Sequence, residues 1–259
     1  MRLQFISIIF LWCLLCVSSC QKAEEDKEDI IDTFPKDTIG STGKITYKAE
    51  TAIYTIVRAK DGNVWLQQNL GATAVATSIN DSLALGDLYQ WGRWSDGHQK
   101  RNPEPKTKEP FTLPRNNPSG LPLGGQHYFI VTWWTIGSID DTWESPIPTD
   151  VSNNNGCDPC KALGSNWRLP TIEEWNKVIE AETISDNISG YNSNLKIIPA
   201  GWRSTKNTFL NEVGNASWFW SNNASTTNAA FGVQISNNKV FNNYSDSRSH
   251  GASVRCIYK

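Results

Sequence analysis

Apolar residues recur at helical spacing in one stretch near the middle of the mature chain, residues 172–182. Thr171 precedes this stretch, and Glu174 follows three positions after it. This is the capping-box pattern, in which each of the two side chains accepts a hydrogen bond from a backbone N–H at the start of a helix. The pattern predicts an amphipathic helix capped at Thr171. The apolar residues expected on its buried face are Ile172, Trp175, Val178 and Ile179.

Shorter apolar or alternating runs on both sides of this helix predict strands. Residues 52–57 are β-branched and aromatic, and Asp61-Gly62 separates them from a second run at 64–66, which predicts a β-hairpin. Near the C-terminus the runs are 216–221, 229–236 and 253–258, with Lys239-Val240-Phe241 before the last of them. Turns rich in Asn and Ser separate these runs, as in an antiparallel sheet. The chain is therefore predicted to form an α+β domain of short antiparallel strands, one or two helices and long loops.

The N-terminal residues have the pattern of a bacterial lipoprotein signal. A positive start at Arg2 and a short apolar run precede small residues and then Cys20. We expect residues 1–19 to be removed as a signal peptide, and Cys20 to carry a lipid anchor that holds the protein in the outer membrane. The alternative is an ordinary signal peptide with an incidental cysteine.

Residues 20–44 are highly charged and poor in large apolar side chains, which is typical of a disordered tether. Lys22 followed by Glu24, Glu25 and Asp26 resembles the acidic export signal of Bacteroidetes-type surface lipoproteins. This resemblance implies that the folded domain, expected at residues 45–259, faces the cell exterior. A generic solvated spacer is the alternative.

The charge and the tryptophan content of the chain bear on its class of function. The formal net charge is −2 over 259 residues, so there is no electrostatic reason to expect a nucleic-acid partner. The chain has twelve tryptophans and one methionine. Tryptophan is large and amphipathic and serves both in cores and on recognition surfaces. We expect most of the tryptophans in the core, with Trp167, Trp175 and Trp220 as the clearest core members.

Five sequence blocks occur in a fixed order along the expected domain: DGNVWLQQNLGATAVATS, GDLYQWGRWSDGHQKR, DPCKALGSNWRLPTIEEW, WFWSNN and HGASVRCIY. With these blocks the chain resembles the Fibrobacter succinogenes major paralogous domain family, from about residue 45 to the last residue. The resemblance implies a C-type-lectin-like fold. It implies little about function, because a fold of this kind hosts many functions.

The resemblance also implies a disulfide bond. In that family the cysteine before the WRLPT block and the cysteine of the final VRC segment form the recurrent pair, which here implies a Cys160–Cys256 bond. An exported protein is in a compartment where such a bond persists. Cys157 is then left over. It could replace Cys160 in the bond, pair with Cys160 across a short loop, or stay free.

No residue pattern supports catalysis or a cofactor. The histidines, His98, His127 and His250, have no metal-ligand spacing, and no phosphate-binding glycine loop occurs. Calcium-dependent lectins carry a Trp-Asn-Asp triplet, whereas Trp220-Ser221-Asn222 lacks the final carboxylate. We therefore expect no enzyme activity, no metal site and no cofactor.

Asn-rich segments between the C-terminal strands are the best candidates for recognition. Tyr, Ser and Asn on rigidly held loops are typical of adaptable binding surfaces. The segment also resembles the variable region of C-type-lectin-like proteins that retroelements diversify. The candidate ligand-binding residues are Trp218, Asn222, Asn223, Asn242, Asn243 and Tyr244.

These observations favour a surface-anchored lipoprotein that acts as a non-catalytic binding or adhesion module. Its expected partner is a glycan or a protein on another surface. One alternative is a structural or accessory subunit of a cell-surface complex. A second alternative is a variable receptor-binding protein diversified by a retroelement.

Overall fold

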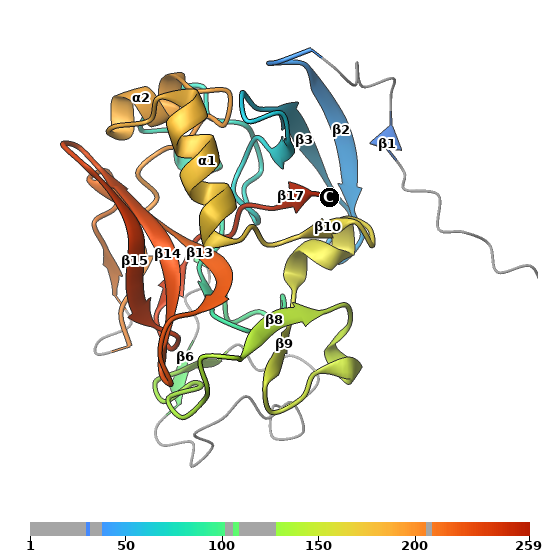
Figure 1. The fold of residues 1–259 in the computed structure, drawn as a ribbon, viewed down its shortest axis with the longest axis vertical. Coiled ribbons are helices and arrows are strands. Elements are labelled where there is room, and N and C mark those ends of the chain that lie inside the picture. Colours follow the sequence, from blue (N-terminus) through green and yellow to red (C-terminus); the bar gives the residue numbers. More distant parts are fainter. Residues whose placement is uncertain (1–29, 32–37, 102–105, 109–127, 206–208) are drawn as a thin grey trace, which may run out of the picture.

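The computed structural model describes residues 30–31, 38–101, 106–108, 128–205 and 209–259 (Figure 1). The expected signal peptide (1–19) and Cys20 lie outside these residues, as do His127 and much of the expected tether. The described part contains mostly antiparallel strands, two α-helices and long connections, which confirms the α+β prediction. Neither of these helices is long and apolar enough to cross a membrane.

One sheet joins the start of the described domain to the end of the chain. Its neighbouring strands are all antiparallel, and the turn containing Gly62 connects β3 to β4, which confirms the predicted hairpin. β2 begins slightly before the domain boundary expected at residue 45. The strands, in order across the sheet, are β1 (Ile30–Ile31), β2 (Thr42–Tyr47), β3 (Ala52–Arg58), β4 (Val64–Leu66), β17 (Ile257–Tyr258) and β10 (Trp167–Arg168).

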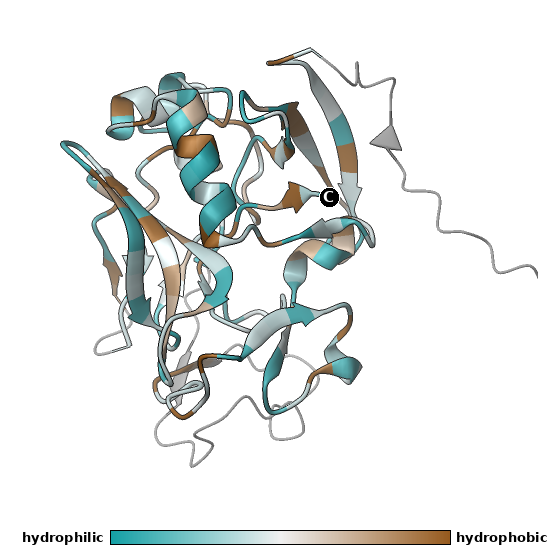
Figure 2. Cartoon of the chain, in the orientation of Figure 1, coloured by the Kyte–Doolittle hydropathy of each residue, from teal (hydrophilic) through white to brown (hydrophobic). Residues whose placement is uncertain are grey.

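A separate three-stranded antiparallel sheet comprises β13 (Ala216–Ala224), β14 (Ala229–Ser236) and β15 (Val240–Ser247), in that order. The first two strands confirm the predicted runs. β14 carries hydrophobic residues along much of its length, whereas β15, at the edge of the sheet, is largely hydrophilic (Figure 2). Residues 242–244 were expected on turns, but they belong to β15, because residues 240–247 pair with β14.

The last predicted run, 253–258, is only partly a strand. Its strand residues are those of β17, and the preceding residues pass through the core. The backbone carbonyls of this segment accept hydrogen bonds both from β13 and from residues 66–70, so the segment does not pair with a single strand along its length. The buried guanidinium of Arg255 donates to the backbone carbonyls of Leu66 and Leu195 and to Asn69 Oδ1. These contacts tie three distant segments together.

The other strands are short. A four-stranded sheet has the order β12 (Leu210–Asn211), β11 (Trp202–Arg203), β16 (Gly251–Ala252) and β5 (Tyr89–Gln90). Two parallel pairs complete the description: β6 (Lys106–Lys108) with β7 (Tyr128–Ile130), and β8 (Thr142–Ser145) with β9 (Asn155–Cys157). The 3-10 helices are η1 (Ser82–Ala84), η3 (Pro148–Asp150) and η4 (Pro159–Leu163).

The predicted helix is α1 (Ile172–Glu182), and its capping box is present. Thr171 Oγ1 accepts a hydrogen bond from the Glu174 N–H at 3.2 Å, and Glu174 Oε2 accepts one from the Thr171 N–H at 2.8 Å. The four predicted apolar residues are all buried. α1 packs against the three-stranded sheet (Figure 1). A shorter helix, α2 (Asn187–Asn192), follows and is capped by Asp186.

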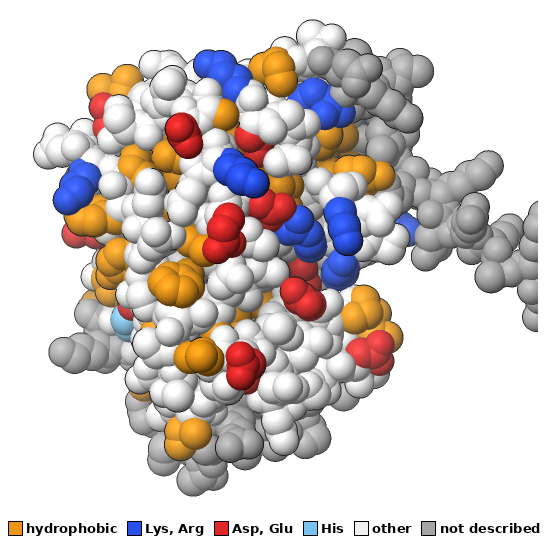
Figure 3. All heavy atoms as spheres, viewed as in Figure 1, with side chains coloured by type: hydrophobic (Ala, Val, Ile, Leu, Met, Phe, Trp, Pro, Cys, Tyr) orange, Lys and Arg blue, Asp and Glu red, His pale blue; other side chains and the backbone are white. Residues whose placement is uncertain are grey.

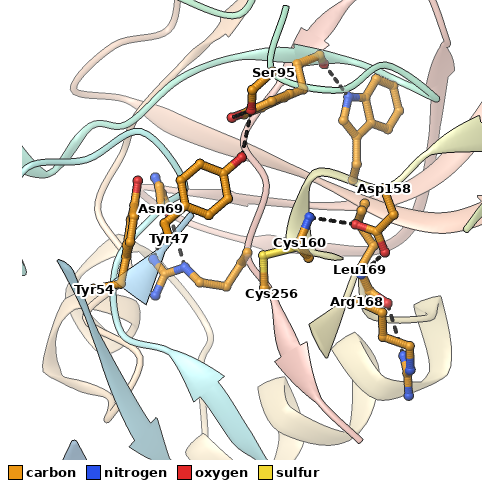
Figure 4. Close-up of a disulfide and its surroundings, with 12 residues drawn as sticks. Tyr47, Tyr54, Asn69, Ser95, Asp158, Cys160, Arg168, Leu169 and Cys256 are labelled. Atoms are coloured by element: carbon orange, nitrogen blue, oxygen red, sulfur yellow. Dashed lines mark hydrogen bonds between the residues drawn. A yellow bond between two sulfur atoms is a disulfide. The ribbon is translucent and has the colours of Figure 1, made fainter. Parts of the chain in front are cut away.

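Cys160 and Cys256 form a disulfide bond with a Cα–Cα distance of 5.6 Å, as the resemblance implied (Figure 4). The Asp158 carboxylate lies beside this bond and accepts hydrogen bonds from the Cys160 N–H and the Leu169 N–H. Cys157 is unpaired and buried. Burial raises the pKa of its thiol to about 12, so the unreactive protonated form predominates.

Tryptophans fill much of the core. Trp167 and Trp175 are fully buried and Trp220 nearly so, which confirms the prediction for these three. A second group packs around Arg248, whose guanidinium lies 4.7 Å from the centre of the Trp91 ring and 5.1 Å from that of Trp134. Arg248 also forms a buried ion pair with Asp141. These contacts join the end of β15 to the loop before β8.

Candidate functional site

The three-stranded sheet has two faces with different roles. On one face, Phe219, Val233 and Ile235 pack with Trp175 of α1 in a common hydrophobic cluster. Side chains alternate between the faces of a strand, so Trp218 lies on the face opposite to Phe219. This second face meets β11 and the segment before β16, rather than a helix.

Four half-buried aromatic side chains form an aromatic cluster on this second face: Trp202 (β11), Trp218 (β13), Tyr244 (β15) and His250. The rings of Trp202 and Trp218 are stacked, with centroids 4.3 Å apart and an interplanar angle of 6°. Tyr244 lies 4.8 Å from Trp218, and His250 lies 5.1 Å from Trp202. Segments far apart in the sequence therefore build one continuous aromatic cluster.

Gly232 explains why Trp218 and Tyr244 meet although β14 separates their strands. Two strands on either side of a third lie roughly 10 Å apart. Gly232 is the β14 partner of Tyr244 and also of Trp220 on β13, so no side chain stands between the outer strands here. A Cβ atom at this position would lie 2.2 Å from the Phe219 carbonyl oxygen. Only glycine, which has no Cβ atom, therefore fits at this position.

Polar groups border the aromatic cluster. His250 Nδ1 lies 2.9 Å and 3.0 Å from the two carboxylate oxygens of Asp246. Burial and, secondarily, the Asp246 charge raise the pKa of the Tyr244 hydroxyl, so this group stays protonated near neutral pH. The indole N–H groups of Trp202 and Trp218 donate to no acceptor in the described part of the chain. Hydrogen-bonding groups thus accompany the apolar rings.

Asn242 and Asn243 lie elsewhere, on the side of β15 that faces α1. They line a groove of about 530 Å³, here called the α1–β15 groove, with residues of α1 and of the segment after it. Asn243 Oδ1 accepts a hydrogen bond of 3.0 Å from the Asn176 side chain. These two candidates therefore do not join Trp218 and Tyr244 in one site.

Asn222 and Asn223, near the end of β13, hold the start of α1. Asn223 Oδ1 accepts a hydrogen bond of 2.8 Å from the Ile172 N–H, one of the helix N–H groups that have no partner within the helix. The Asn222 N–H donates to the Pro170 carbonyl, and its side chain donates to Glu144. Their contacts fix the junction between the sheet and the helix.

Sequence reasoning therefore found part of each surface and missed the rest. Trp202, His250 and Asp246 of the aromatic cluster were not candidates, nor were Asn176 and Glu180 of the groove. Trp218 and Trp220 alternate along a predicted strand, which places them on one face. No sequence signal predicts that β11 lies against that face, because this placement depends on contacts between distant segments.

The described residues contain no group of three or more His, Cys, Asp or Glu side chains placed to hold a metal ion. His98 is fully buried, and each of its two ring nitrogens has a hydrogen-bonding partner. Nε2 accepts a hydrogen bond from the Gln90 N–H at 2.9 Å, and Nδ1 lies 2.6 Å from Asp96 Oδ1. This arrangement fixes the neutral tautomer with the proton on Nδ1. His98 is thus a structural residue.

His98 is expected to make the protein less stable in mild acid. Burial, followed by the nearby Arg93 charge, lowers its pKa to about 4 in the folded protein, against about 6.5 in the unfolded chain. Between these values only the unfolded chain binds the extra proton, so the free energy of unfolding falls as the pH falls from 6.5 to 4. The loss reaches about 3 kcal/mol.

Urea unfolding at several pH values between 7 and 4 measures this loss. The His98→Asn variant should start from a lower stability and show a weaker pH dependence over this range. Equal pH profiles for wild type and His98→Asn would show that another group is responsible.

Comparison of the chain with protein-family models, with curated proteins and with solved structures finds no match. The C-type-lectin-like fold therefore stays a prediction from the resemblance.

Proposed function

We propose that the protein is a surface-anchored lipoprotein of the outer membrane, held by Cys20, with its domain facing the cell exterior. Its single domain, of C-type-lectin-like fold, acts as a binding or adhesion module without catalysis. The aromatic cluster is the proposed ligand contact, and a glycan is the proposed ligand. The observation that carries this proposal is the stacked Trp202–Trp218 pair extended by Tyr244 and His250.

The construction of the cluster supports a binding role. Its rings come from β11, β13, β15 and the segment before β16, so strand pairing and packing hold each ring. Tyr and Trp supply a large contact area at a low cost in conformational entropy, because their side chains have few rotatable bonds. A rigid aromatic surface that is already assembled loses little entropy when a ligand binds.

The chemistry of the cluster favours a glycan. The apolar faces of aromatic rings pack against the C–H groups of a sugar ring, and hydroxyl groups need nearby donors and acceptors. Asp246 and His250 supply such groups at the border of the rings. In the view of Figure 3, acidic and basic side chains are interspersed, and the cluster itself contains no Lys or Arg. Among the described residues, the four of the cluster therefore offer no Lys or Arg to a polyanionic ligand such as nucleic acid.

Replacing Tyr244 by alanine tests the proposal. We expect the variant to lose at least tenfold in affinity for any glycan that the wild type binds on a glycan array, because the change removes one end of the aromatic surface. Phe241→Ala is the matched control, since Phe241 is an aromatic residue of the same strand, is 39% exposed and lies outside the cluster. It should bind as the wild type does.

Two outcomes would contradict the proposal. Unchanged glycan binding by Tyr244→Ala would exclude the aromatic cluster as the contact. A blank array for the wild type, combined with co-purification of partner lipoproteins, would instead favour a structural subunit of a surface complex.

A further inference from the structure

β15 contains a β-bulge at the residues that face α1. Gln234 pairs with Phe241, and Gly232 pairs with Tyr244, so two residues of β15 stand opposite one residue of β14. Asn243 has a φ of 57°, in the left-handed region that Asn tolerates better than most residues. In a regular strand Asn242 and Asn243 would point to opposite faces. The bulge instead brings both residues to the lining of the α1–β15 groove.

The α1 side of the groove supplies complementary polar groups. Asn176 donates to Asn243 Oδ1 through Nδ2, while its own Oδ1 is buried and accepts no hydrogen bond from any described residue. A buried acceptor without a donor carries an energetic cost, which a donor on a ligand would remove. Glu180, one helical turn further along α1, is exposed and also lines the groove.

The groove has an apolar base. Ile179 and Ile184 line it, and each of these side chains is 5% exposed. A volume of about 530 Å³ lies within the range of roughly 300–1,000 Å³ that is typical of small-molecule sites. A small apolar base with several amide and carboxylate groups around it suits a ligand that has both C–H faces and hydroxyl groups.

We propose that the α1–β15 groove is a second ligand subsite that binds a neutral saccharide unit. The inference rests on the proposed function, since it adds a second contact to the same glycan-binding module. The hydroxyl groups of the sugar would donate to Asn176 Oδ1 and to the Glu180 carboxylate, and would accept from the side-chain N–H groups of Asn242. The sugar's C–H face would lie on Ile179 and Ile184.

The charge of the groove selects against anions. Its lining residues include one carboxylate, that of Glu180, and no Lys or Arg. A phosphate, a sulfate or an acidic sugar would therefore meet repulsion without a compensating cation. A neutral ligand with several hydroxyl groups meets both donors and acceptors.

A titration of the 15N-labelled protein with soluble neutral disaccharides (cellobiose, maltose and lactose), followed by NMR, tests the two sites at once. The side-chain amide signals of Asn176, Asn242 and Asn243 report on the groove. The indole N–H signals of Trp202 and Trp218 report on the aromatic cluster. We expect at least one disaccharide to shift the amide signals.

The readouts separate the two proposals. Shifts of the indole signals alone would overturn the groove assignment and leave the aromatic cluster as the binding site. Shifts of the amide signals alone would support the groove and contradict the role of the aromatic cluster. If tetralysine shifts the amide signals and no disaccharide does, the groove is a site for a cationic peptide, and the assignment to saccharides is wrong.

Two substitutions strengthen the test. Asn243→Gly removes the amide that holds Asn176 in place and suits the left-handed backbone, and Glu180→Gln removes the charge of a proposed acceptor while keeping its shape. Each should weaken disaccharide binding at the groove about tenfold, because the first frees Asn176 from its position and the second replaces a charged acceptor by a weaker neutral one. Asn238→Gly, in the turn before β15, and Glu173→Gln, on the first turn of α1, are the matched controls and should bind normally. Unchanged affinity in both test variants would overturn the assignment.

Discussion

Replacing Asp141 by asparagine is expected to lower the free energy of unfolding by about 3 kcal/mol or more. Asp141 is 4% exposed, and its Oδ2 pairs with Arg248 at 2.5 Å and accepts hydrogen bonds from Trp134 Nε1 and the Ser138 N–H. The substitution keeps the side-chain shape but leaves the Arg248 charge buried without a counter-charge. Urea unfolding measures the effect.

Asp140→Asn is the matched control, because Asp140 is the adjacent residue and is exposed. It should change the free energy of unfolding by less than about 0.5 kcal/mol, as is usual for surface substitutions. A loss below 1 kcal/mol in Asp141→Asn would show that the Trp91 and Trp134 rings and the backbone carbonyls around Arg248 are sufficient to hold its charge.

Removing the Cys160–Cys256 bond is the second change with a large expected effect. The two cysteines are 96 residues apart. A bond that closes a loop of this size stabilises the folded state by about 4 kcal/mol, chiefly by restricting the unfolded chain. In a Cys160→Ala/Cys256→Ala double variant, calorimetry should therefore find a melting temperature lower by on the order of 10 °C.

A reducing agent gives the same test without a substitution. It should lower the melting temperature of the wild type and of Cys157→Ala, because Cys157 is outside the bond. It should have no effect on the double variant. If the reductant leaves the melting temperature of the wild type unchanged while thiol labelling shows that the bond is open, then closing this loop does not stabilise the folded state.

Local patterns in the sequence predicted the parts of the fold that depend on neighbouring residues. The Thr171–Glu174 capping box and the apolar spacing located α1, and Asp61-Gly62 located the hairpin of β3 and β4. Such features succeed because their hydrogen bonds and turn conformations involve residues close together in the chain. The α+β class followed from the same patterns.

The pattern of polar and apolar residues was less informative where tertiary contacts override the local preference for a turn or a strand. The Asn-rich residues 242–244 have the composition of a turn, yet they form part of β15, because β14 pairs with Phe241 and Tyr244 on either side of the bulge at Asn242 and Asn243. Residues 253–256 alternate like a strand, yet the Arg255 guanidinium takes its acceptors from two distant segments, residues 66–69 and Leu195. Neither outcome depends on nearby residues, so neither could be read from composition.

The candidate functional residues also divide into features that the sequence predicted and contacts that only the tertiary structure shows. The sequence by itself determined that Trp218, Tyr244 and the asparagines lie close to the C-terminal strands, and the family resemblance added the Cys160–Cys256 bond. Only the tertiary structure decided that Trp202 stacks on Trp218 and that the bulge turns Asn243 toward Asn176. The physical reason is that both contacts join segments that strand pairing and side-chain packing bring together, and a pattern of single residues does not specify which segments become neighbours.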